Sequence, residues 1–148
     1  MKATIIILIA LSAFNVAHAQ VVLEPANQPV PLSGIIREIH GFGPPGYGED
    51  KKTDAHVTYL VIDLPKPINI ACSPERPQWA SEDCEAARRL KLFFPASSGG
   101  DPEKLERTAE KLVGRRVSVT GVLHRADTVG EMTPIYIDVT AIESAGGK

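Results

Sequence analysis

Two segments near the C-terminal end of the chain alternate apolar and polar side chains and leave few folds open to it. Residues 116–123 (RVSVTGVL) and 135–142 (IYIDVTAI) are apolar or small at every second position. Successive side chains of a β-strand point to opposite faces, so this period predicts two strands that each bury one face. The predicted inward-facing residues are Val117, Val119, Gly121 and Leu123 in the first strand, and Ile135, Ile137 and Val139 in the second.

Three upstream segments also have strand character. They are residues 32–39 (LSGIIREI), 57–64 (VTYLVIDL) and 90–94 (LKLFF), each rich in the residue types that strands favour. In residues 57–64 both faces carry apolar side chains, so we expect both to be partly covered. Pro65 and Pro67 follow, and because proline donates no ladder hydrogen bond, we predict a break there before a short strand at residues 68–70.

A single helix is predicted over residues 102–113. Asp101 is a good N-cap, Pro102 suits the first helical position, and Gly114 is placed to end the helix. The apolar side chains at i, i+4 and i+7 are those of Leu105, Ala109 and Leu112. Only this narrow face is apolar, so we expect it to pack against the two strands that follow.

The order is strand, strand, interrupted third strand region, helix, strand, strand. It matches a mainly β fold, an OB-like five-stranded Greek-key barrel with one helix between its third and fourth strands. An open sheet with one packed helix is the alternative, and it is favoured if the first and fourth strands do not pair. We expect this domain to span residues 32–143.

The chain begins with a segment typical of secretory signals. Residues 1–19 combine one lysine, a short apolar run and a small-residue cleavage pattern, which predicts a cut between Ala19 and Gln20. Residues 20–31 contain three prolines and are predicted to be an extended arm, and residues 144–148 a flexible tail. No second apolar stretch reaches transmembrane length, so we predict a periplasmic or secreted protein.

Cys72 and Cys84 are the only cysteines of the chain. Exported proteins meet an oxidising environment, so we predict a disulfide between them, which would stabilise a loop of that size by about 3 kcal/mol. Two free structural thiols are the alternative.

Three stretches carry a resemblance to a known family. They are residues 42–54 (FGPPGYGEDKKTD), 59–68 (YLVIDLPKPI) and 112–123 (LVGRRVSVTGVL). Together they resemble the uncharacterised bacterial secreted family called domain of unknown function 4431, over about Leu32 to Val139. The family typically has a histidine run where this chain reads GEM at residues 130–132, so no metal or acid–base role carries over. The resemblance implies no established activity.

Composition and motifs give no support to an enzyme, a cofactor or a nucleic-acid partner. The chain has 16 basic and 18 acidic residues, a net charge of -2, and so no excess of cations for phosphate. It contains no nucleophile elbow, no P-loop and no zinc-ligand spacing. His124, Asp127 and Glu131 fall in one loop that could hold a divalent cation weakly, but a solvated polar hairpin is the favoured interpretation, and we predict no metal.

The best candidate for a ligand or partner patch combines two loops that flank the binding groove of OB barrels. The predicted residues are Phe42 and Tyr47 in the first loop, and His124, Arg125, Asp127 and Glu131 in the second. The alternative is that the two aromatic side chains pack inward and only stiffen their loop.

We therefore predict a small, non-enzymatic binding module of the bacterial envelope, whose partner is an unknown envelope protein or small ligand. A hydrolase or nuclease-like accessory enzyme on the same barrel is one alternative. An inhibitor or immunity-type partner of another secreted protein is the other. Two carboxylates and a basic residue around a concave pocket would favour the enzyme, whereas scattered side chains would favour the binding module.

Overall fold

A computed structural model describes residues 21–23, 28–70, 86–98, 100–126 and 133–146. This part of the chain forms strands, one α-helix and one short 3-10 turn. The elements are β1 (Val21–Leu23), β2 (Val30–Phe42), β3 (His56–Ile70), β4 (Ala87–Phe93), η2 (Ala96–Ser98), α1 (Pro102–Lys111), β5 (Arg116–Arg125) and β6 (Ile135–Ser144).

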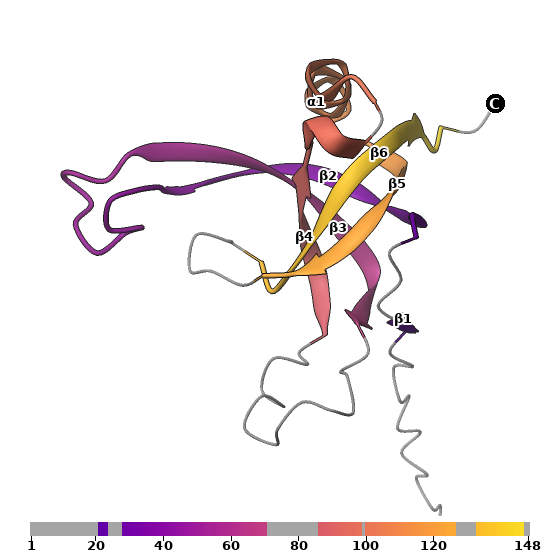
Figure 1. Cartoon of the computed structure of the whole chain (residues 1–148), viewed down its shortest axis with the longest axis horizontal. Coiled ribbons are helices and arrows are strands. Elements are labelled where there is room, and N and C mark those ends of the chain that lie inside the picture. The colour runs from indigo at the N-terminus through magenta and orange to yellow at the C-terminus, as the bar shows by residue number, and fades with distance from the viewer. Residues whose placement is uncertain (1–20, 24–27, 71–85, 99, 127–132, 147–148) are drawn as a thin grey trace, which may run out of the picture.

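Five strands close into a barrel (Figure 1). Their order is β3, β2, β5, β6 and β4, and β4 pairs with β3 to complete the ring. The pairing of β2 with β5, with Leu32 opposite Val119, is the pairing of first and fourth barrel strands that an open sheet would lack. The predicted mainly β, OB-like barrel is thus confirmed, with α1 between its third and fourth strands, β4 and β5.

β2 is long enough to serve two neighbours. Its residues 30–35 pair with β5 and its residues 35–42 pair with β3, so Ile35 lies opposite both Arg116 and Asp63. Gly34 lies at this corner, where a Cβ atom would be 2.5 Å from the Asp63 carbonyl oxygen and 2.6 Å from Ile62 Cγ1. Only glycine lets the two strands approach this closely, which is a common device for turning a barrel corner.

The side chains that the sequence alternation predicts to face inward fill the barrel interior. Val117, Val119, Ile137 and Val139 are fully buried, and Ile135 is nearly so. They form one cluster with apolar residues of the other strands, namely Ile36, Ile62, Leu64, Ile68, Ala87, Leu90 and Leu92. On β3 both Val61 and Ile62 are fully buried, which confirms that both faces of this strand are covered.

α1 closes one end of the barrel. Asp101 is its N-cap and accepts a hydrogen bond from the backbone N–H of Lys104 at 3.1 Å. Ala109 is fully buried in the barrel cluster, and the helix packs against β6. After the helix, Gly114 has a positive φ of 80°, and its N–H donates to the Ile36 carbonyl oxygen at 2.8 Å. The predicted N-cap is present, but the helix ends at Lys111 with Leu112 as its C-cap, two residues before the predicted end. Of the two following strands that were expected to cover the helix, β6 makes the main contact.

The predicted break at Pro65 and Pro67 is wrong, because β3 continues from His56 to Ile70. The register between β3 and β4 shifts between Asp63 and Ile68 instead. Such a bulge leaves extra residues unpaired on one strand, so the missing N–H groups of the prolines cost no ladder hydrogen bond. β1 then pairs in parallel with the end of β3, with Val21 opposite Ile68.

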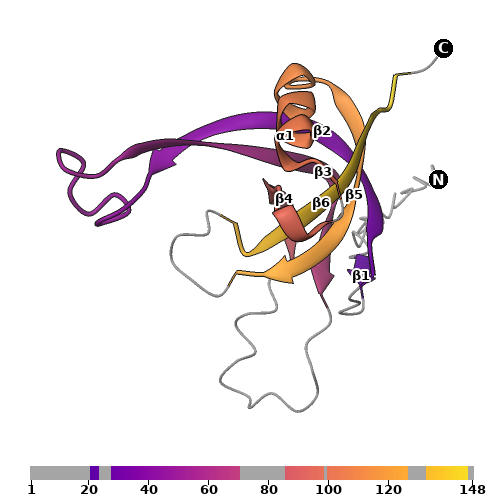
Figure 2. The same ribbon diagram turned by 45° about the horizontal axis from the view of Figure 1, so that its top comes forward.

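β2 and β3 extend beyond the barrel as a long hairpin, whose tip lies to one side of the barrel in both views (Figures 1 and 2). Residues 1–20, both cysteines, Asp127 and Glu131 lie outside the described part of the chain, so the predictions about them stay predictions. No helix in the described part has the length and apolarity that a membrane crossing requires.

Candidate functional site

The outer surface of the barrel carries a row of four ring side chains and one lysine from four strands. Lys91 Nζ of β4 lies 4.8 Å from the ring centroid of Tyr59 on β3. Phe93, also on β4, meets Tyr136 of β6 edge to face at 6.3 Å. Tyr136 in turn stacks on His124 of β5, with ring centroids 5.1 Å apart and planes 16° apart. We name these five residues the outer row.

Strand periodicity and register together build the outer row. The alternation that buries Leu92 turns Lys91 and Phe93 to the other side of β4. The register places Tyr136 opposite both Lys91 and His124. Phe93 is 48% exposed, although it is one of the larger apolar residues of the chain. The row therefore presents an aromatic surface to solvent that no described part of the chain covers.

The outer row ends beside a carboxylate. His124 Nε2 lies 3.0 Å from Asp138 Oδ2, within ion-pair distance when the imidazole is protonated. The geometry does not make this a hydrogen bond, and among the described residues neither His124 Nε2 nor Asp138 Oδ1 has a hydrogen-bond partner. Covered polar atoms usually have partners, so this pair is an exception within the described residues.

Three charged side chains flank the outer row on β2, β3 and β4. Arg89 donates two hydrogen bonds to the Asp63 carboxylate, at 2.6 and 2.9 Å, and Arg37 lies 3.9 Å from it. The hydrogen bond from Arg89 holds the pKa of Asp63 below its ordinary value, against the opposing effect of burial, and the charges of Arg89 and Arg37 add to this. The same contact raises the pKa of Arg89. Because all three are partly exposed, we expect little stability from them.

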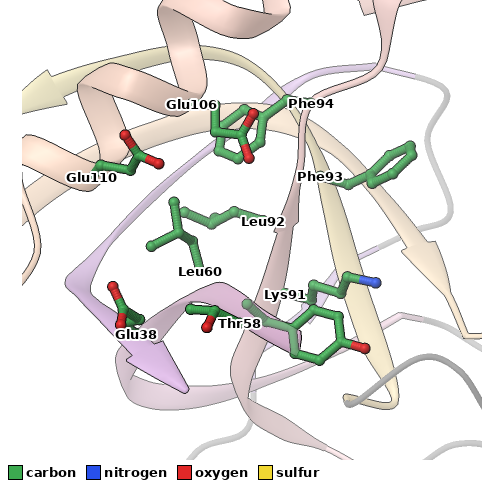
Figure 3. Close-up of a pocket in the computed structure, with 10 residues that line it drawn as sticks. Glu38, Thr58, Leu60, Lys91, Leu92, Phe93, Phe94, Glu106 and Glu110 are labelled. Atoms are coloured by element: carbon green, nitrogen blue, oxygen red, sulfur yellow. The ribbon is translucent and has the colours of Figure 1, made fainter. Parts of the chain in front are cut away.

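A second feature lies where β3 and β4 separate. The two strands pair from Ile68 and Ala87 as far as Val61 and Lys91. Beyond that point β3 continues beside β2, whereas β4 continues beside β6. We call this divergence the fork. It contains a pocket of about 370 Å³ that α1 borders (Figure 3).

The fork pocket has an apolar part and an acidic part. Figure 3 shows Lys91 and Phe93 on one side of β4, with Leu92 and Phe94 on the other. The apolar lining includes Leu60, Leu92, Phe93 and Phe94, and the carboxylates around it are Glu38 from β2 and Glu106 and Glu110 from α1. Tyr59 and Lys91 of the outer row also line the pocket. The three glutamates are exposed. Sequence analysis did not indicate this pocket, because it depends on where two strands part.

The predicted residues Phe42 and Tyr47 lie in the β2–β3 hairpin. The ring of Phe42 lies 4.9 Å from that of His56, and a Cβ atom on Gly48 would be 3.6 Å from Phe42 Cδ2. Phe42 thus packs within its own loop, as the alternative interpretation expects of it. Tyr47 is 44% exposed and has a φ of 50°. It stays a candidate for contact with a partner.

Asp54 organises this loop, and sequence analysis did not single it out. Its buried carboxylate accepts backbone N–H groups from Gly46 at 2.7 Å, Gly48 at 2.7 Å and Asp50 at 3.2 Å. Burial favours the neutral acid, but the three N–H donors together favour the carboxylate more, and the pKa of Asp54 lies below its ordinary value. The Gly/Pro loop is therefore an ordered structure around one acceptor.

His124 and Arg125 form the end of β5, and the structure joins His124 to the outer row. The hairpin tip that carries Tyr47 projects away from the barrel (Figures 1 and 2). Asp127 and Glu131 lie outside the described residues, so a single patch made of both loops stays a prediction. The alternation of residues 135–142 already turned Tyr136 and Asp138 outward and could have added them to the candidate site.

Within the described ranges, no group of three or more histidine, cysteine, aspartate or glutamate residues is arranged to hold a metal ion. No protein-family model, curated protein or solved structure matches this chain. Function therefore has to be inferred from the geometry of the chain's own residues.

Proposed function

We propose that the protein is an exported binding module that takes a saccharide chain on its outer row. The observation that carries the proposal is the set of contacting rings of Phe93, Tyr136 and His124, in which Phe93 is half exposed. Lys91 lies over the Tyr59 ring on the adjoining strands. OB barrels bind oligosaccharides and oligonucleotides on the face of their second and third strands, which are β3 and β4 here.

Sugars suit the chemistry of this row. The C–H face of a sugar ring is apolar and slightly positive, so it packs against the negative face of an aromatic ring. Sugar hydroxyls both donate and accept hydrogen bonds, and the partly exposed side chains of His124 and Asp138 lie at the end of the row. Arg37 and Arg89 add donors beside the row. An oligosaccharide would thus find stacking surfaces and hydrogen-bonding groups together.

Nucleic acid is the less favoured ligand of the same surface. Bases also stack on aromatic side chains, but affinity for nucleic acid comes largely from cations that neutralise phosphates. Here Asp63 already neutralises Arg89, and Asp138 adds a second carboxylate to the face. The net charge of the chain is -2, so its overall field also repels phosphate.

Calorimetric titration with chitotetraose, maltotetraose and an eight-nucleotide oligothymidylate tests the proposal. We expect at least one saccharide to bind and the oligonucleotide not to bind. Phe93→Ala should weaken saccharide binding roughly tenfold, since a stacking aromatic contributes about 1–3 kcal/mol to binding. Tyr47→Ala is a matched control, because Tyr47 is 44% exposed against 48% for Phe93 but lies in the hairpin loop.

Each other outcome of this titration contradicts the proposal. Binding of the oligonucleotide alone would identify a nucleic-acid module, and binding of nothing would remove the saccharide function. If Tyr47→Ala weakened binding while Phe93→Ala did not, the site would be the loop patch predicted from the sequence.

Two sequence features support the exported part of the proposal. Residues 1–19 have the composition of a cleaved signal, and the resemblance noted above is to a secreted family. Sequencing the N-terminus of protein recovered from the periplasm should give Gln20 as the first residue, whereas recovery of full-length protein in the cytoplasm would contradict export. Thiol titration of the same sample should find no free cysteine if Cys72 and Cys84 are bridged.

An enzyme is the second candidate, and two observations favour it. His124 lies beside Asp138, an arrangement that orients an imidazole for proton transfer, and the fork places three glutamates and Lys91 around a pocket. The exposed glutamates lack the burial that usually tunes catalytic carboxylates, so we place binding first. Release of reducing sugar from chitotetraose or maltotetraose, abolished by His124→Ala, would establish the enzyme instead.

A further inference from the structure

The fork leaves two strand edges open. Residues 56–60 of β3 pair with β2 on one side, and residues 91–93 of β4 pair with β6 on one side. Among the described residues no strand pairs with residues 56–60 of β3 or with residues 92 and 93 of β4 on the side that faces the fork, since the pairing of the two strands ends at Val61 and Lys91. Open edges carry backbone donors and acceptors that another strand can use.

The backbone groups of both edges point into the fork. The Lys91 N–H donates to Thr133 Oγ1 on the β6 side, at 3.1 Å. Backbone groups of alternate residues point to opposite edges of a strand, so those of Leu90 and Leu92 face β3. Ile62 lies opposite Leu90 and therefore faces β4.

The same alternation continues along β3. The backbone groups of Leu60 and Thr58 point to the same edge as those of Ile62, which is the edge that faces the fork. Both residues line the pocket. A strand inserted here would thus meet donors and acceptors at every second residue of β3.

The side of α1 that borders the fork carries negative charges that destabilise the helix. Glu106 and Glu110 lie at i and i+4, where like charges repel, and Glu110 lies in the last turn, where the helix dipole disfavours a negative charge. Within the described residues neither has an ion-pair partner, whereas Glu103 pairs with Arg107 at 3.1 Å. Glu38 completes the acidic lining and lies 3.6 Å from His40 Nε2.

We infer that the fork is the docking site for an extended cationic segment of a partner protein, which adds as a strand to the open edge of β3. The lysine or arginine side chains of the segment lie against Glu38, Glu106 and Glu110, and its apolar side chains cover Leu60 and Phe94. This interaction goes beyond saccharide binding, because it uses the strand edges and the helix side of the fork, although Tyr59, Lys91 and Phe93 of the outer row also line the pocket.

The dimensions fit such a segment. Residues 56–60 offer an edge of about 17 Å at roughly 3.4 Å per residue. The pocket of about 370 Å³ lies in the range of sites that enclose a ligand side chain. In strand addition, backbone hydrogen bonds supply affinity and pockets for alternate side chains supply specificity. The charge of the pocket selects a basic segment over an acidic one.

Fluorescence polarisation with a labelled, capped heptapeptide that alternates lysine and valine tests the inference. Three unlabelled peptides serve as competitors. One alternates glutamate and valine. The other two alternate lysine and valine, and each is methylated on a different set of alternate backbone nitrogens. We expect the acidic peptide not to compete and at least one methylated peptide to lose competition, because methylation removes the N–H groups that would bond to β3.

Variants of the full chain locate the site. Glu106→Gln with Glu110→Gln should raise Kd roughly fivefold or more, since each exposed charge contact contributes a few tenths to 1 kcal/mol. The same double variant should not lower Tm, because it removes an unfavourable pair. Glu103→Gln is the matched control on the same helix and should leave Kd unchanged. Thr58→Pro should also weaken binding, because it removes an N–H that faces the fork.

Other results would overturn the inference. If both methylated peptides competed as well as the unmethylated lysine–valine peptide, no strand would be added. If spermidine competed as well as that peptide, the fork would be a site for small cations. Absence of binding by the lysine–valine peptide would remove the docking site. His124→Ala removes a ring of the outer row that does not line the fork pocket and should leave the peptide Kd unchanged, so failure of this inference and failure of the saccharide proposal are distinguished.

Discussion

Asp54 is the residue that holds the Gly/Pro loop together, because its carboxylate receives N–H groups from three separate positions of the loop. The glycines and prolines of residues 43–48 favour a loop, and β2 continues as far as Phe42. The sequence does not show which of Glu49, Asp50 and Asp54 accepts those N–H groups, since that depends on the path of the backbone. Ordered loops can thus look featureless in a sequence.

The lowered pKa of Asp54 makes the order of this loop depend on pH. A carboxylate whose pKa is lower in the folded state stabilises the fold fully above its unfolded pKa, about 3.9, and loses this contribution as the pH falls through the folded value. The amide NMR signals of Gly46 and Gly48 should therefore change with a midpoint below 3.9, the ordinary value for aspartate. A midpoint at or above it would contradict the assignment.

Asp54→Asn tests the same contacts at neutral pH. The amide keeps one acceptor oxygen but turns an NH2 group toward a backbone N–H, so at least one of the hydrogen bonds is lost. We expect faster proteolysis within residues 43–55 and unchanged cleavage elsewhere. Asp50→Asn is the control, because the Asp50 side chain accepts only from the exposed Lys52 N–H.

His124 shows how much of the candidate site the sequence predicts. Its outward direction follows from the alternation of β5, and it was predicted as a site residue. Its neighbours Tyr136 and Asp138 follow from the same alternation in β6. The places of Tyr59 and Phe93 in the row do not follow from this alternation. They depend on the register and curvature of strands that are far apart in the sequence.

At the scale of elements, strand and helix positions follow from local pattern, but irregularities do not. The helix, its Asp101 cap and the five barrel strands agree with period, propensity and turn residues. The predicted break at Pro65 and Pro67 is wrong because a proline interrupts a strand only where its N–H would form a ladder hydrogen bond. The shifted register between β3 and β4 removes that requirement. The separation of β3 and β4 that makes the fork has no local sequence signal.

Gly34→Ala tests the corner of β2. The added methyl group would clash with the Asp63 carbonyl oxygen and with Ile62, both less than 2.7 Å from the new atom. Overpacking against backbone typically costs about 1–3 kcal/mol in unfolding free energy, and we expect the upper part of that range. Chemical denaturation measures the loss. Ser33→Ala, at the exposed neighbouring position, should change the unfolding free energy by no more than about 0.5 kcal/mol. Equal losses from the two substitutions would contradict the role of Gly34 at the corner.

At the scale of the whole molecule, β4 contributes side chains to two surfaces. β4 turns Lys91 and Phe93 to the outer row and Leu92 and Phe94 to the fork (Figure 3). Leu92 also belongs to the barrel core, whereas Phe93 of the outer row and Glu106 and Glu110 of the fork are exposed and can be changed without altering the core. On the two proposals made above, the module would bind a saccharide on the outer row and a protein segment in the fork.

The most direct test of the saccharide function is a map of backbone amide shifts during titration with chitotetraose and maltotetraose. We expect the largest shifts at Tyr59, Phe93, His124, Tyr136 and Asp138, with residues 43–55 of the hairpin tip and the carboxyl half of α1 unchanged. Shifts confined to the hairpin tip, shifts spread evenly over the barrel, or no shifts with either saccharide would contradict the proposal that the outer row binds sugars.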